Sequence, residues 1–151
     1  MQALTINGTD YMPEFNFGFY KNLSKELNSN NAIDTLLSGL AANNPEILIQ
    51  MVHAGLMNQK NTPSTEDVAN ALDERFAEAE GDELFCEAVK DLQSSGFLKS
   101  KMAQWKRYIE NVMANSEKVL KNLSDVEEKI QGEMAVNESK VLVKTIDNYL
   151  K

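Results

Sequence analysis

The stretch Ala32–Leu56 constrains the fold most strongly, because it holds two short apolar runs separated by Asn43-Asn44-Pro45. The first run spaces its large apolar residues at i, i+3, i+4 and i+7, which is one stripe of a helix: Ile33, Leu36, Leu37 and Leu40. In the second run, Pro45–Leu56, apolar residues point nearly all round the axis, which is typical of a central, buried helix. Asn44 is suited to cap that helix and Pro45 to its first position. We therefore predict a tight helical hairpin at the centre of a small domain.

A β-hairpin is predicted at the start of the chain. Asn7-Gly8 separates two short alternating runs, and both positions of the favoured two-residue turn need positive φ. Such a turn places Ile6 opposite Thr9 and Leu4 opposite Tyr11. An isolated two-stranded hairpin is marginal in water, so we expect it to lie on the helices or to pair with another molecule.

Three further helices are predicted before residue 97. The first follows a cap at Asn16, the second follows a capping box formed by Ser64 and Asp67, and the third ends at Ser94-Ser95-Gly96. Together these elements indicate a mainly α fold, with an N-terminal β-hairpin followed by a compact helical bundle. We assign residues 1–98 to this first domain.

Residues 99–151 are predicted to form a C-terminal helical extension. From Met102 the apolar positions alternate steps of three and four for about four heptads, with one polar member: Met102, Trp105, Ile109, Val112, Ser116, Val119, Leu123, Val126 and Ile130. A capping box at Ser124–Glu127 interrupts this seam. One long amphipathic helix and a helical hairpin that turns near Leu123 therefore remain alternatives.

Charge argues against nucleic acid as a partner. Residues 1–97 carry 5 basic and 15 acidic side chains, and residues 98–151 carry 10 and 8. An acidic body binds phosphate poorly, since DNA affinity comes mainly from Lys and Arg. The absence of a leader and of a long apolar run predicts a protein that does not enter a membrane. A single cysteine, Cys86, favours a reducing, cytosolic setting.

No constellation of reactive residues is present. Zinc sites and catalytic triads need more partners than His53 and Cys86 can supply, so both are interpreted as structural residues. The carboxylates of Asp73–Asp91 are spread around helices and lack the spacing of a calcium loop, which indicates a solvated face. We expect no catalytic residues, no cofactor and no metal. Trp105 is either part of the core or an anchor for a partner.

In this order, the elements resemble a known family. A hairpin runs into an aromatic-rich helix, LTINGTDYMPEFNFGFYKNL. An apolar helical pair ends in IQMVHAGL, an acidic helix follows a proline in PSTEDVANALDE, and a last helix ends in VKDLQSSGFLK. Residues 2–102 are similar to the tail assembly chaperones of long-tailed phages, siphophages in type, especially those of Gram-positive hosts and related prophages. The run after Met102 lies outside this resemblance.

The resemblance implies a non-enzymatic protein of the infected host cytoplasm that is absent from the finished virion. Its implied partners are the tape measure protein, which it keeps soluble, and the tail tube protein, which a longer frameshifted form would contact. The heptad seam supplies an apolar face for a helical client, with these predicted partner-binding residues: Met102, Trp105, Ile109, Val112, Val119 and Leu123. We also expect self-association. The alternative is a helical oligomeric adaptor of another assembly.

Overall fold

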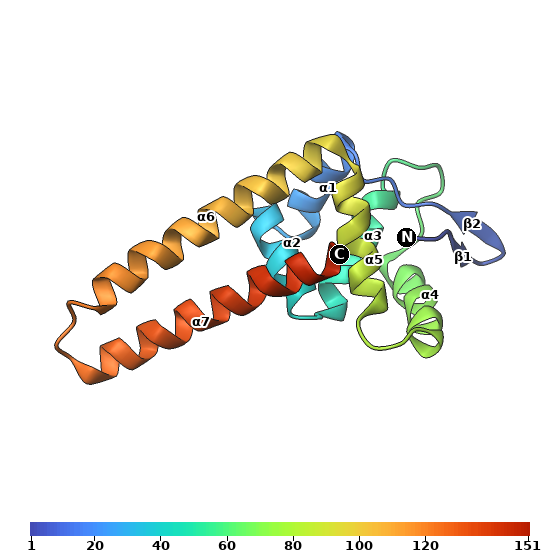
Figure 1. Cartoon of the computed structure of the whole chain (residues 1–151). Coiled ribbons are helices and arrows are strands. Elements are labelled where there is room, and N and C mark those ends of the chain that lie inside the picture. The colour runs from blue at the N-terminus through green and yellow to red at the C-terminus, as the bar shows by residue number, and fades with distance from the viewer.

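A computed structural model describes all residues, 1–151, and is mainly helical, as predicted. Two strands and seven helices follow one another along the chain: β1 (Leu4–Ile6), β2 (Thr9–Tyr11), α1 (Phe17–Glu26), α2 (Ala32–Ala41), α3 (Pro45–Leu56), α4 (Thr65–Glu78), α5 (Glu83–Ser94), α6 (Gly96–Leu120) and α7 (Val126–Tyr149). Helices α1–α5 gather beside the strands, and α6 and α7 project from them as a long antiparallel pair (Figure 1). We call β1 to α5, with the start of α6 and the end of α7, the body, and residues 108–139 the distal hairpin.

The β-hairpin has the predicted register. Leu4 pairs with Tyr11 and Ile6 with Thr9. Asn7 and Gly8 have φ of 50° and 76°, as the two-residue turn requires. Leu4 and Ile6 are buried, and β1 packs on α4. Thus the hairpin lies on the helices, while β2 is the outer strand.

The predicted helix starts are confirmed by their caps. The Asn16 side chain accepts from the amide of Phe19, and the Asn44 side chain accepts from the amide of Glu46. Ser64 and Asp67 form the full capping box. These contacts satisfy amides that have no partner within the helix, and so they fix where α1, α3 and α4 begin.

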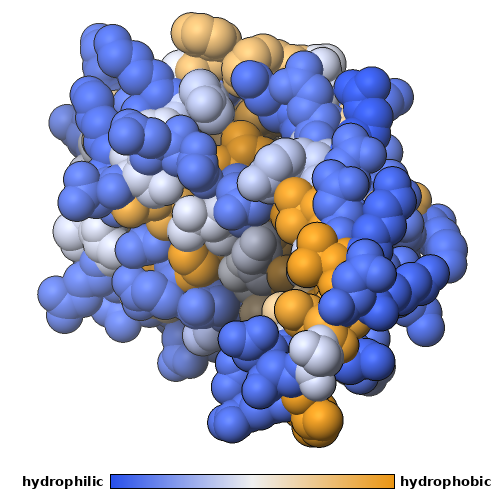
Figure 2. All heavy atoms as spheres, turned by 90° about the vertical axis from the view of Figure 1, so that its left-hand side faces the viewer, coloured by the Kyte–Doolittle hydropathy of each residue, from blue (hydrophilic) through white to orange (hydrophobic).

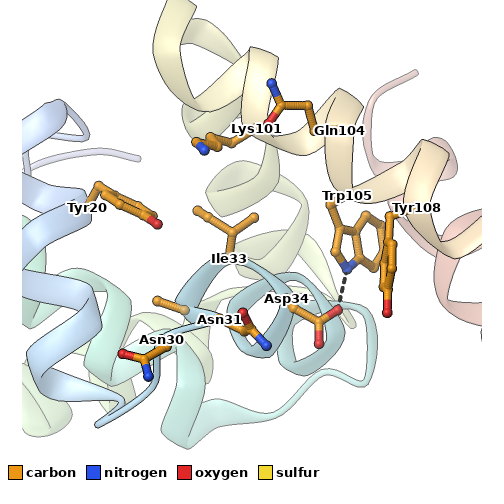
Figure 3. A pocket seen from close by; sticks show the side chains of 10 residues that line it. Tyr20, Asn30, Asn31, Ile33, Asp34, Lys101, Gln104, Trp105 and Tyr108 are labelled. Atoms are coloured by element: carbon orange, nitrogen blue, oxygen red, sulfur yellow. Dashed lines mark hydrogen bonds between the residues drawn. The ribbon is translucent and has the colours of Figure 1, made fainter.

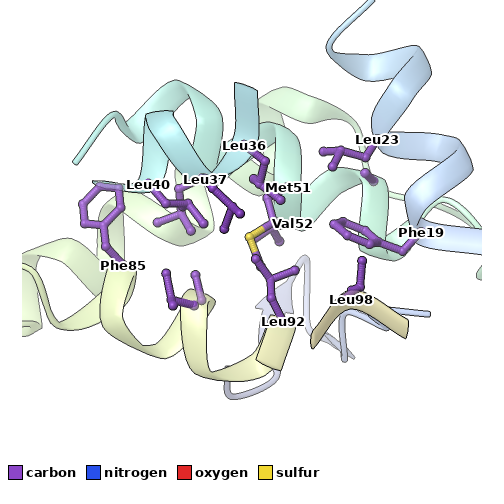
Figure 4. Close-up of a cluster of buried hydrophobic side chains, with 14 of the residues drawn as sticks. Phe19, Leu23, Leu36, Leu37, Leu40, Met51, Val52, Phe85, Leu92 and Leu98 are labelled. Carbon is purple, nitrogen blue, oxygen red and sulfur yellow. The ribbon is translucent and has the colours of Figure 1, made fainter. Parts of the chain in front are cut away.

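The core of the body is centred on the predicted α2–α3 pair. Side chains from five helices meet there (Figure 4), among them Phe19, Leu23, Leu36, Leu37, Leu40, Met51, Val52, Phe85, Leu92 and Leu98. Helix α3 buries residues on several sides, as a central helix should. None of the helices combines the length and the apolar character needed to cross a bilayer.

The C-terminal region forms two helices rather than one. Helix α6 ends at Leu120, and Asp125 caps α7 by accepting from the amide of Glu128 at 2.9 Å. The end of α7 returns to the body, where its apolar residues join the main core: Val143, Ile146 and Tyr149. The predicted boundary at residue 98 falls inside α6, and the division into two domains stays a prediction.

Candidate partner-binding site

The six predicted partner-binding residues lie in different environments. Met102 and Trp105 are buried in the body's core, and Ile109 and Leu123 are partly buried. Val112 and Val119 are exposed, with 41% and 60% of their surface accessible. The seam is therefore not one uniform surface in this structure, because its first part packs on the body and its later part faces solvent.

Trp105 lies in the core, one of the two interpretations that the sequence left open. Its indole Nε1 donates to Asp34 Oδ1 of α2 at 2.7 Å (Figure 3). This hydrogen bond satisfies the only polar atom of the indole side chain and ties α6 to the central helix pair. Its role as a partner anchor is untested.

The two faces of the α6–α7 pair differ in chemistry. On one face, ion pairs cross between the helices: Lys106 Nζ lies 2.7 Å from Asp147 Oδ2, and Lys140 Nζ lies 2.6 Å from Glu117 Oε1. The hydrogen bond from Lys140 holds the pKa of Glu117 below its ordinary value. No ion pair joins the helices on the other face, which is occupied mainly by apolar and small side chains.

That second face contains a groove of about 400 Å³. We call it the hairpin groove, and it is lined by residues of both helices and of the turn: Val112, Met113, Asn115, Ser116, Val119, Leu120, Leu123, Glu128, Gly132, Ala135, Val136 and Ser139. Figure 2 views the molecule from the side on which the distal hairpin projects, and a band of hydrophobic atoms runs there between hydrophilic ones. The groove has the apolar lining that a helical partner needs.

The wall that α7 contributes to the groove was not predicted. Gly132, Ala135 and Ser139 follow one another at steps of three and four, so they share one side of α7. The prediction counted only large apolar side chains and therefore missed small ones. A Cβ at Gly132 would collide with Leu120 Cδ2, which shows how closely the two helices approach there.

A second pocket, of about 470 Å³, lies where α6 meets α1 and α2. Its walls mix aromatic and polar side chains, among them Tyr20, Asn31, Lys101 and Tyr108 (Figure 3). Beside it, Phe17, Tyr20 and Phe97 form an aromatic cluster, and Phe17 is 67% exposed. Sequence reasoning missed this cluster, because its members come from helices far apart in the chain.

The aromatic cluster and the hairpin groove lie along one side of α6. At 100° per residue, Phe97, Tyr108, Val112 and Val119 fall on one flank of the helix. We call these four residues, with Phe17 and Tyr20, the α6 flank. It reaches over 22 residues of helix, or roughly 33 Å. Such a flank has the length and the apolar character for contact with a long amphipathic helix.

The end of α7 is fixed to the body by polar contacts. The Tyr149 hydroxyl donates to Asn43 Oδ1 at 2.6 Å, and the Cys86 thiol donates to the Tyr149 carbonyl at 3.3 Å. Burial, with a smaller contribution from Asp82, raises the pKa of Tyr149 to about 12. These contacts hold α7 against α2 and α5.

His53, a residue type that is often catalytic or metal-binding in other proteins, lies against a carboxylate here. His53 Nδ1 lies 3.1 Å from Glu26 Oε2, between α3 and α1. No group of three or more His, Cys, Asp or Glu side chains is placed to hold a metal ion.

Comparison with known proteins gives one match. The profile of a family described as "Phage tail assembly chaperone protein, TAC" matches residues 3–107, more than two thirds of the chain. Searches of the curated proteins and of the solved structures returned no match. The matched region covers β1 to α5 and the first part of α6, but not the end of α7 that packs on them, and the family suggests a non-enzymatic role in assembly. This chain belongs to the phage tail assembly chaperone family.

Proposed function

We propose that this protein binds helical segments of the phage tape measure protein and keeps them soluble during tail assembly. It also helps to recruit tail tube subunits, in the host cytoplasm, and is absent from the mature virion. The phage is of the long-tailed, siphophage type with a Gram-positive host. The chaperone family supports the general role, and the client, the compartment and the host are our inference.

One observation carries the choice of client: the α6 flank leads into an apolar groove that has no intramolecular occupant. Exposed apolar surface of this extent is typical of an interaction site. A groove between two helices accepts a third amphipathic helix through residues spaced at i, i+3, i+4 and i+7. The flank begins within the matched residues 3–107, while the groove lies beyond them. Family membership alone therefore does not assign the groove.

The acidic body fits this role. A protein that holds an aggregation-prone helix needs a charged exterior elsewhere, since net charge keeps complexes apart in solution. The net charge of the chain is −8, and the acidic excess lies in residues 1–97. The apolar groove and the acidic body are thus on different parts of the molecule.

Co-expression tests the proposal. The tape measure protein of the same phage would be expressed alone, with this chain, or with a Val112→Lys/Val119→Lys variant. We expect the native chain to raise the soluble fraction of the client several-fold and the variant to lose most of that gain. Ala114→Lys is the matched control, because Ala114 is exposed on α6 but does not line the groove.

Two results would contradict the proposal. If the native chain leaves the client insoluble, the protein is better explained as an oligomeric adaptor. If the groove variant and Ala114→Lys rescue the client equally, the client binds elsewhere.

A further inference from the structure

The exposed apolar residues of α6 and α7 are spaced so that they would share one face of a single helix, although the hairpin places them on separate faces. Both helices together expose seven large hydrophobic side chains: Tyr108, Val112, Val119, Val126, Ile130, Met134 and Val141. If residues 96–149 formed one continuous helix, these seven would fall within an arc of about 80°. In the hairpin these residues do not form one surface. Gly132 packs against Leu120 of α6, and the exposed apolar residues of α7 lie on the opposite side of that helix.

The turn between the helices differs little from a helix. Lys121 donates its amide to Glu117, four residues back, and Asn122 and Leu123 donate to residues three back. The backbone is clearly non-helical at Asp125, the cap of α7, where φ is −75° and ψ is 123°. The turn contains neither Gly nor Pro. No residue of the turn therefore bars a continuous helix through α6 and α7.

We propose that the α6–α7 hairpin opens at Ser124–Asp125 into one continuous helix whose apolar face pairs with the same face of a second copy of this chain. The heptad seam supports a second copy as the occupant. A two-stranded coiled coil needs apolar residues every 3.5 positions on both helices over about three heptads. The part of the seam outside the body's core, Ile109 to Ile130, meets that need and has Ser116 as its one polar member.

Opening of the hairpin costs free energy, and this cost determines the protein concentration at which it occurs. It removes Val143, Ile146 and Tyr149 from the core and breaks the Tyr149–Asn43 hydrogen bond. A single chain gains nothing in return, so the closed hairpin is the resting form. Pairing of two open chains buries both seams, which makes opening dependent on protein concentration. This inference does not depend on the identity of the client.

Two turn variants separate the closed and open forms. Ser124→Pro suits the hairpin, because the Ser124 amide makes no backbone hydrogen bond, and it blocks a continuous helix. Ser124→Ala/Asp125→Ala removes the cap of α7 and favours a continuous helix. Circular dichroism would confirm that both variants keep the helical content of the native chain.

The decisive experiment measures distance and association on the same proteins. Spin labels would be placed at Gln104 and Asn148, both exposed, in a Cys86→Ala background, diluted with unlabelled protein. The closed hairpin brings these positions together, since Lys106 contacts Asp147, whereas a continuous helix separates them by about 66 Å. Sedimentation at low and high concentration would report dimer formation.

We expect the fraction of molecules with the long label-to-label distance and the fraction of dimer to rise together as protein concentration increases. Compared with the native chain, Ser124→Pro should weaken association at least tenfold and the double alanine variant should strengthen it at least tenfold. Val126→Lys/Ile130→Lys should abolish the dimer and leave the fold intact, and Gln131→Lys, which lies outside the arc, should not. Equal association of the two turn variants, or no long distance in the alanine variant, would overturn the proposal.

Discussion

The body and the distal hairpin use apolar side chains in different ways. In the body, Leu36, Leu37 and Leu40 have no accessible surface, whereas Val119 and Val126 of the hairpin region keep 60% and 71% of theirs. Both regions are helical, so secondary structure does not explain the difference. The body completes its own core, and the hairpin presents an apolar surface that another molecule can cover. The same residue types stabilise the fold in one region and are available for binding in the other.

The largest expected effect is a difference in unfolding free energy between two alanine substitutions, one in the body and one in the distal hairpin. Leu37→Ala should lower the free energy of unfolding by about 2–5 kcal/mol, because it leaves a cavity in a packed core. Val119→Ala should change it by less than about 0.5 kcal/mol, since an exposed side chain contributes little to folding. Denaturant unfolding of both variants measures this. Similar losses would show that the hairpin is also part of the fold's core.

Two glycines allow a second contrast. A Cβ at Gly39 of α2 would lie 2.5 Å from Ile47 Cγ1 of α3 and close to two more atoms of that side chain. Gly39→Ala should therefore cost about 1–3 kcal/mol despite the better helix propensity of alanine. Gly96→Ala is the control, because nothing lies within 4 Å of its Cβ, and it should be neutral or slightly stabilising. Thermal unfolding distinguishes them.

Tyr149 tests how firmly the end of α7 is held. Tyr149→Phe removes the hydrogen bond to Asn43 and should lower stability by about 0.5–1.5 kcal/mol. The pKa of Tyr149 is raised in the folded state, from 10.0 to about 12. The stabilisation that it gives is therefore fully present below pH 10 and is lost as pH rises toward 12. Unfolding measured over this range should depend less on pH in the Phe variant, and an identical dependence would contradict the assignment.

The smallest expected effect concerns the ion-paired face of the hairpin. Hydrogen bonding from Lys140 lowers the pKa of Glu117, so the pair contributes above pH 4.5 and its contribution is lost as pH falls through the lowered pKa. The effect is small, because both side chains are exposed and screened by salt. Hydrogen exchange of α6 amides should rise slightly in Glu117→Gln at neutral pH. Glu127→Gln, a substitution in the first turn of α7, serves as the control.

The body was predictable because its signals are local. Asn7-Gly8 specified the hairpin register, and Asn16, Asn44 and Ser64 specified where helices begin. Contacts between distant parts of the chain were harder to predict. No local pattern shows that Trp105 donates a hydrogen bond to Asp34, 71 residues away, or that Phe17 packs against Phe97. The turn at 121–125 was left open because the heptad period favours one long helix and the capping box predicted at Ser124–Glu127 favours two. The structure places the cap one residue later, at Asp125, whose side chain accepts from the amide of Glu128.

The predicted binding residues show the same limit. Periodicity identified a seam from Met102 onward but could not show that the body covers Met102 and Trp105. It also omitted Gly132, Ala135 and Ser139, whose small side chains form the groove wall on α7. The sequence indicates which residues can share a helix face, and the tertiary fold decides which of those faces stay exposed.

The central claim is that the client helix lies in the hairpin groove, and hydrogen–deuterium exchange with and without the tape measure protein tests it most directly. We predict that the client slows amide exchange most in residues 112–123 and 128–139, which hold the groove-lining side chains. Val112→Lys/Val119→Lys should remove that protection, and Ala114→Lys should retain it. Protection confined to the body, with the groove residues unchanged, would contradict the account.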